Sequence, residues 1–149
     1  MILVLNGPNL SRLGSREPDI YGTETYNELV SACQETAADL GVQVDIRQTD
    51  LEGEMIGWLH EAANEVDGIV LNAGAWTHYS YALRDAVADV TGNGVPVIEV
   101  HLSQPAARES FRHVSVVAPV VMGSITGLKL EGYRLALRAL AAGAAAVKR

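Results

Sequence analysis

Cysteine is almost absent from this sequence: Cys33 is the only one in 149 residues. A single cysteine excludes an internal disulfide and any zinc site made of several thiolates, and it fits a reducing compartment. The helical pattern around Cys33 predicts a core position. Apolar runs are short, and none approaches the ~20 residues of a membrane-spanning helix. Residues 1–5 lack the basic flank and the length of a signal peptide, so we expect a cytoplasmic protein.

Positive charge is also scarce. Eleven basic residues against 18 acidic ones give a formal net charge of -7. Nucleic acids and anionic membranes attract basic surfaces, so neither is an expected partner. Hydrophobic residues make up 48% and charged residues 19%, which is the balance of a globular protein and not of a disordered one. This length predicts one domain over residues 1–149, because a second folding unit would leave neither half much core.

The motifs of common cofactors are missing too. There is no G-x-G-x-x-G after the first apolar run, no P-loop and no H-E-x-x-H. Segment 123–127 resembles a nucleophile elbow, but its serine is one place early, so we interpret it as a structural turn. Asn6 and Asn72 stand where a receiver-type magnesium site would need carboxylates. Both lysines, Lys129 and Lys148, lie in the C-terminal region, so we expect no Schiff base, no cofactor and no metal ion.

Short apolar runs alternate with helical patterns, which is typical of βαβ units. Strands are predicted at 2–6, at 42–46 as an edge strand, and at 68–71, 95–100 and 114–117. Helices are predicted from the Thr25/Glu28 capping box to Leu40 and over 55–66, 81–90 and 130–147, and residues 7–22 form a long loop. The fold class is α/β: a flavodoxin-like doubly wound five-stranded parallel sheet of order 2-1-3-4-5, with helices on both faces.

Ligands of such a sheet bind beyond the carboxyl ends of its strands, at the switch point between strands one and three. Polar residues gather in the loops that follow these strands: Asn9, Arg16 and Tyr21 after strand one, segment 72–78 after strand three, and Glu99, His101 and Ser103 at strand four. Each alone is more often an ordinary loop residue. Together they indicate a cationic pocket on an acidic protein, which suits a small anionic substrate and proton transfer.

Tyr21 is the candidate base, because a phenol becomes basic when a cation such as Arg16 favours its ionised form. His101 is the candidate acid, oriented by Glu99 two residues earlier on the same strand face. The spacing of Arg16 and Tyr21 alone equally supports a solvated arginine and a tyrosine that packs in the loop.

Six ordered motifs that run nearly end to end resemble the type II 3-dehydroquinate dehydratases, also called type II dehydroquinases. They are NGPNL (6–10) with LG (13–14), REPDIYG (16–22), NAGAWTH (72–78) with ALRDA (82–86), IEVHLS (98–103), RESFR (108–112) and GYRLAL (132–137).

The resemblance implies reversible loss of water from 3-dehydroquinate to give 3-dehydroshikimate, through an enolate and without metal or Schiff base. By analogy, Tyr21 as phenolate removes the C2 proton, and Arg16 stabilises the developing charge. Asn9 positions a water on the enolate oxygen, in an oxyanion-hole role. His101 protonates the departing C1 hydroxyl. Aromatic biosynthesis through the shikimate pathway and quinate breakdown both use this step, so the sequence leaves that choice open.

The resemblance also implies substrate contacts: Asn72, His78, Arg112, and the backbone of Leu102 and Ser103 at the carboxylate. Asp85 matches a residue that reaches in from a neighbouring subunit. Because the family forms trimers arranged into dodecamers, we expect a homo-oligomer, and residues 7–22 would close as an active-site lid.

Several residues depart from the family pattern, among them Gln104, Val114 and Lys129. They motivate an alternative function, a catalytically silent module that binds a small anion on the same fold.

Overall fold

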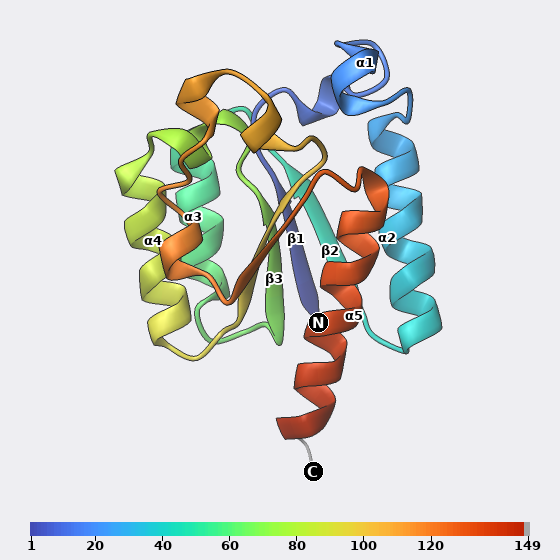
Figure 1. The fold of residues 1–149 in the computed structure, drawn as a ribbon. Helices are drawn as coiled ribbons and strands as arrows, with labels where there is room; N and C mark the ends of the chain where they lie inside the picture. Colours follow the sequence, from blue (N-terminus) through green and yellow to red (C-terminus); the bar gives the residue numbers. More distant parts are fainter. Residues whose placement is uncertain (148–149) are drawn as a thin grey trace.

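The computed structural model describes residues 1–147. Its centre is a parallel sheet of five strands in the order β2-β1-β3-β4-β5 (Figure 1). The strands are β1 (Ile2–Asn6), β2 (Val44–Gln48), β3 (Gly68–Asn72), β4 (Val97–His101) and β5 (Gly123–Thr126). The predicted flavodoxin-like order is therefore confirmed, and β2 is an edge strand as expected.

Helices cover both faces of the sheet. Helices α2 (Tyr26–Leu40) and α5 (Leu130–Val147) lie on one face, and α3 (Glu52–Ala62) and α4 (Tyr81–Gly92) lie on the other (Figure 1). The short helix α1 (Pro18–Tyr21) sits above the edge at which the strands end. No helix within residues 1–147 is both long and apolar enough to cross a membrane.

The alternation of side chains along each strand divides the core into two layers. Leu3 and Leu5 of β1 belong to the core under α3 and α4, whereas Ile2 and Val4 belong to the core under α2 and α5. All four side chains are at most 2% exposed. Because the central strand β1 is covered on both faces, apolar residues are favoured on both, which explains its unbroken aliphatic run from Ile2 to Leu5.

Helix α2 begins and ends as predicted. Thr25 Oγ1 accepts a hydrogen bond from the Glu28 N–H, and the Glu28 carboxylate accepts one from the Thr25 N–H, which completes the capping box. Gly41 ends the helix in the left-handed region, at φ 67°. Cys33 is fully buried on this helix, and burial raises the pKa of its thiol to about 12, so it is a core residue.

The predicted position of the fifth strand, at 114–117, is wrong. Residues 114–117 form a loop, and the fifth strand is β5, which takes up residues 123–126 of the segment interpreted as a turn. The last residue of that segment, Gly127, has left-handed backbone, at φ 82°. The valines of 114–117 mimic a strand, but the Ser115 hydroxyl accepts hydrogen bonds from the N–H groups of Val117 and Ala118. That local bonding replaces a sheet ladder.

Smaller differences concern the ends of elements. Helix α3 ends at Ala62, and Val66 packs on the core from the turn that follows, so the helical period outlasts the helix. Strand β4 begins at Val97, after Pro96, which has no N–H for a ladder. Segment 7–22 contains a 3-10 turn at Leu10–Arg12 and helix α1, and is not simply a loop.

Candidate active site

One cavity lies beyond the carboxyl ends of β1, β3 and β4. Nine of the residues singled out in the sequence line it: Asn9, Arg16, Tyr21, Asn72, His78, His101, Leu102, Ser103 and Arg112. They come from segment 7–22, from the last residue of β3 and the turn after it, and from the last residue of β4 and the loop after it. The structure thus brings these residues together beyond the strand ends, as the sequence predicted.

Close contact between two loops forms one wall of this cavity. Gly7 leaves β1 and donates its N–H to the Asn72 carbonyl at 2.8 Å, and a Cβ on Gly7 would lie 2.9 Å from backbone atoms of Ala73. Any side chain at position 7 would therefore push the loops apart. Asn9 follows in the left-handed region, at φ 69°, with its N–H bound to the Asp50 carboxylate at 2.8 Å. Asparagine tolerates this conformation better than most residues.

Tyr21 lies between two arginines at the end of α1. The guanidinium carbon of Arg16 is 5.3 Å from the centroid of the Tyr21 ring, and that of Arg108 is 5.1 Å from it. Two guanidinium groups at this range make cation–π contacts with the ring. The structure thus favours the site interpretation of Arg16 and Tyr21 over the solvated and loop-packing alternative.

Arg108 is a cavity residue to which sequence reasoning gave no role. Its Nη1 donates to Ser103 Oγ at 3.2 Å, which fixes it beside the strand end. Its Nε is buried and has no hydrogen-bond partner within residues 1–147. A buried guanidinium N–H without a partner suits an anionic or hydroxylated ligand. The RESFR motif was the available signal, since Arg108 opens it.

His101 and Glu99 form a buried pair on β4. Their side chains are 10% and 2% exposed, and His101 Nε2 lies 3.5 Å from Glu99 Oε1. At this distance Nε2 pairs with the carboxylate when the ring is protonated, and it makes no hydrogen bond within residues 1–147. His101 Nδ1 is then the ring nitrogen that remains for a ligand in the cavity. Glu99 does not line this cavity but supports His101 from behind.

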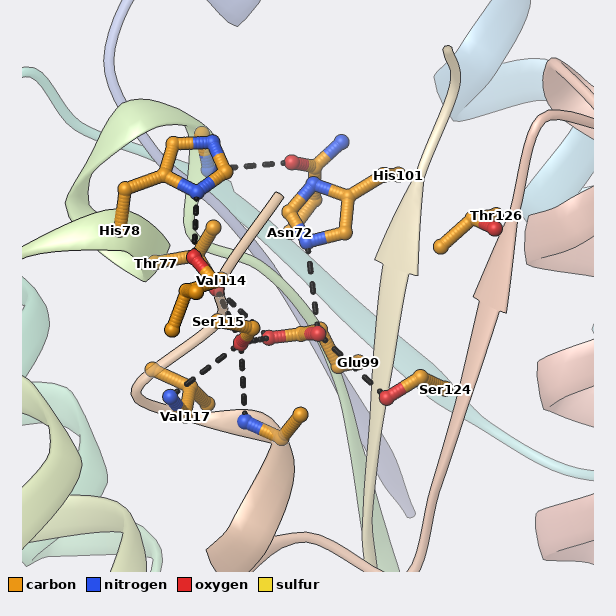
Figure 2. A network of polar contacts seen from close by, with 12 residues as sticks. Asn72, Thr77, His78, Glu99, His101, Val114, Ser115, Val117, Ser124 and Thr126 are labelled. Atoms are coloured by element: carbon orange, nitrogen blue, oxygen red, sulfur yellow. Dashed lines mark hydrogen bonds and ion pairs between the residues drawn. The ribbon is translucent and has the colours of Figure 1, made fainter. Parts of the chain in front are cut away.

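Three hydroxyl groups surround Glu99, and sequence reasoning missed all of them (Figure 2). Oε2 accepts from Thr77 Oγ1 at 2.6 Å and from Ser115 Oγ at 2.7 Å, while Ser124 Oγ lies 3.4 Å from Oε1. Burial acts to raise the pKa of Glu99, but contact with His101 and the Thr77 and Ser115 donors outweigh it, so this pKa lies below its usual value. Glu99 is therefore ionised at neutral pH.

His78 stands beside His101, with ring centroids 6.5 Å apart. Its Nδ1 lies 2.8 Å from the Val114 carbonyl, which only accepts, so Nδ1 carries the proton and Nε2 can accept from a ligand. Burial and the positive charges of His101 and Arg112 lower the pKa of His78, against the opposing effect of the Val114 carbonyl. His78 is thus neutral at neutral pH.

Gln104 and Val114, which depart from the family pattern, lie near the site. Gln104 Oε1 accepts from Thr126 Oγ1 at 2.7 Å. Val114 is 64% exposed, and its link to the site is the carbonyl that holds His78, so its residue type matters little there. Lys129 has left-handed backbone at φ 51°, a conformation that glycine adopts more readily.

Besides Glu99, Asp85 is the other candidate that does not line the cavity. It is exposed on α4 and is absent from the residues that line the cavity. Within residues 1–147 there is also no cluster of three or more His, Cys, Asp or Glu side chains placed to hold a metal ion.

The sheet and its site define a flavodoxin-like α/β protein with a cationic small-molecule cavity at the carboxyl edge. Residues 1–141 match the profile of the family described as "Dehydroquinase class II". The chain belongs to the class II dehydroquinase family.

Named relatives agree with this assignment. A 3-dehydroquinate dehydratase of Salinispora tropica is 57% identical over 141 residues, which cover 95% of this chain and 96% of that protein. One of Bacillus licheniformis is 57% identical over 136 residues, with 91% and 92% coverage. The crystal structure of the type II dehydroquinase from Propionibacterium acnes has a TM-score of 0.90 and 52% identity, and the match covers 95% of each chain.

Proposed function

We propose that this protein is a 3-dehydroquinate dehydratase, a hydro-lyase that converts 3-dehydroquinate to 3-dehydroshikimate through an enolate. Family membership supports the reaction. The single observation that carries the chemistry is a phenol held beside two guanidinium groups in the same cavity as a histidine backed by a carboxylate. These are a base and an acid for one elimination.

The first step of the proposed mechanism uses four side chains. Tyr21, as phenolate, takes the C2 proton of the substrate, and the electron pair of that C–H bond moves into the enolate. Arg16 and Arg108 balance the negative charge. A water held by Asn9 donates to the enolate oxygen.

In the second step the enolate re-forms the ketone, and the C1 carbon–oxygen bond breaks. His101 gives its proton to the leaving hydroxyl, which departs as water. Glu99 stabilises the imidazolium before this transfer, in the way that a buried carboxylate orients a histidine in other enzymes.

Substrate binding would use the remaining cavity residues. Ser103 and the backbone of Leu102 would hold the carboxylate, and Arg112, Asn72 and His78 would hold hydroxyl groups. Segment 7–22 would act as the lid, because helix α1 carries Tyr21 above the strand ends (Figure 1). No cofactor or metal ion enters any step of this proposal.

We also infer that the protein is a homo-oligomer in the cytoplasm, a dodecamer that is built from trimers. Exposed Asp85 would reach the cavity of a neighbouring subunit. Light scattering should then give a mass near twelve chains, and Asp85→Asn should lower kcat without changing that mass. A fully active monomer would contradict this part of the proposal.

The decisive experiment measures turnover of 3-dehydroquinate by the purified protein in the presence of a chelator. The enone absorbance of the product reports the turnover. We expect full activity there and no covalent adduct on borohydride treatment. Tight binding of a substrate analogue without turnover would instead identify a silent anion-binding module. Trapping by borohydride would indicate imine chemistry.

A further inference from the structure

A chain of three buried polar side chains runs beneath the cavity. Asn6 and Asn72 are register partners on β1 and β3, and Tyr133 of α5 bonds to both. The Tyr133 hydroxyl donates to Asn6 Oδ1 at 2.7 Å and accepts from Asn72 Nδ2 at 2.8 Å. Tyr133 and Asn6 are 0% exposed and Asn72 is 3% exposed. Each of these buried groups has the partner that burial demands.

Two backbone groups fix the direction of the hydrogen bonds that join Asn6, Tyr133 and Asn72. Asn6 Nδ2 donates to the Arg47 carbonyl at 3.2 Å, which leaves Asn6 Oδ1 to accept from Tyr133. At the other end the Gly74 N–H donates to Asn72 Oδ1 at 3.1 Å, so Asn72 turns Nδ2 toward Tyr133. A carbonyl only accepts and an N–H only donates. The amide of Asn72 therefore has one orientation and cannot flip without losing both contacts.

We propose that Tyr133 is a positioning residue that acts through Asn72 and makes this side chain offer an N–H to the substrate. The inference rests on the proposed dehydratase function. One N–H of the Asn72 amide reaches Tyr133, and the other belongs to a side chain that lines the cavity beside His78 and His101 (Figure 2). The substrate atom that faces it is therefore an acceptor, a hydroxyl or carbonyl oxygen.

Tyr133 suits this role because it donates and accepts at once. Burial raises the pKa of its phenol, so the proton stays on the oxygen. Tyr133 does not line the cavity formed within residues 1–147, so any effect of its hydroxyl on the substrate passes through its partners.

The first test is a double-mutant cycle on KM for 3-dehydroquinate and on Kd for the product by calorimetry. Tyr133→Phe keeps the ring and removes the hydroxyl; we expect KM and Kd to rise about tenfold, with kcat within about threefold. Asn72→Ala removes the donor itself. In that background, Tyr133→Phe should change Kd by less than about twofold, since coupled residues are not additive. Additive effects of the two substitutions would overturn the proposal.

Thr36→Val is the matched control. It removes another buried hydroxyl, which donates to the Ala32 carbonyl at 2.7 Å within α2. This variant should keep the wild-type KM, Kd and kcat. An equal rise of KM in both variants would show a general effect of lost stability and would contradict a role through Asn72.

The second test needs no turnover. Nuclear magnetic resonance should show slow solvent exchange of the Asn72 side-chain amide protons in the wild type, and exchange at least about tenfold faster in Tyr133→Phe, because the fixed partner is gone. Unchanged exchange in the folded variant would overturn the proposal. A wild-type protein without turnover would contradict the proposed function, while the amide measurement would still decide the role of Tyr133.

Discussion

The guanidinium of Arg108 lies over the ring of Tyr21, with 5.1 Å between its carbon and the ring centroid. Tyr21 belongs to segment 7–22, above the sheet. Arg108 belongs to the loop after β4 and donates a hydrogen bond to Ser103 Oγ. The phenol thus meets a cation that the strand end holds in place. Arg16, by contrast, belongs to the same segment as Tyr21, residues 7–22.

We predict that Arg108→Gln lowers kcat about 5–30-fold, because a cation beside an aromatic ring in a partly desolvated site contributes ~1–2 kcal/mol. Steady-state kinetics with 3-dehydroquinate measure this. Arg138→Gln is the control, since Arg138 is 53% exposed and pairs with Glu131 on α5. Wild-type kcat in Arg108→Gln would show that Arg16 alone supplies the positive charge.

Tyr21→Phe should lower kcat by at least about 10³-fold. General base catalysis typically contributes 10²–10⁴-fold, and the proposed mechanism has no other group that removes the C2 proton of the substrate. Product affinity by calorimetry should stay within about threefold of the wild type. Tyr81→Phe, at a tyrosine that is 70% exposed, provides the comparison and should retain full activity. Substantial turnover by Tyr21→Phe would assign the base to another group.

Ser115→Ala should move the acidic limb of the kcat/KM profile to higher pH. Ser115 helps to hold the pKa of Glu99 below its usual value, so its loss raises that pKa and protonates the carboxylate at higher pH. One lost hydrogen bond corresponds to a displacement of about one pH unit. Ser124→Ala removes a longer contact of 3.4 Å and should produce a smaller displacement. A limb that moves downward or not at all would separate Glu99 ionisation from activity.

Thr25→Ala should lower the free energy of unfolding by about 1 kcal/mol and Tm by about 3 °C, because it removes the capping box of α2. Differential scanning calorimetry measures the change. Thr23→Ala, at an exposed residue just before the cap, should leave Tm unchanged. Equal Tm values for the two variants would mean that the cap contributes nothing to stability.

The sheet order and most of the site could be predicted because both depend on local signals. Unbroken apolar runs such as that of β1 require cover on both faces, and helices between parallel strands provide it. Once the order is known, the residues after each strand end must share one edge. Asn9, Asn72 and His101 meet in one cavity for this reason.

Contacts between loops could not be predicted in the same way. Strand β5 has four residues, begins with Gly123 and is partly exposed, so it has no clear pattern, while the valines of 114–117 imitate a strand. The hydroxyl donors to Glu99 and the contact of Arg108 with Tyr21 depend on tertiary geometry alone. The spacing of residues along the sequence does not indicate these contacts.

The register of β1 with β3 places Asn6 opposite Asn72. Successive side chains of a strand point to opposite faces, so inserting or deleting one residue within either strand would turn one amide to the other side of the sheet. The geometry of the site therefore depends on the length of these two strands as well as on their composition. The connections at the amino edge of the sheet contain no residue that lines the cavity, so a change in their length would leave this register intact.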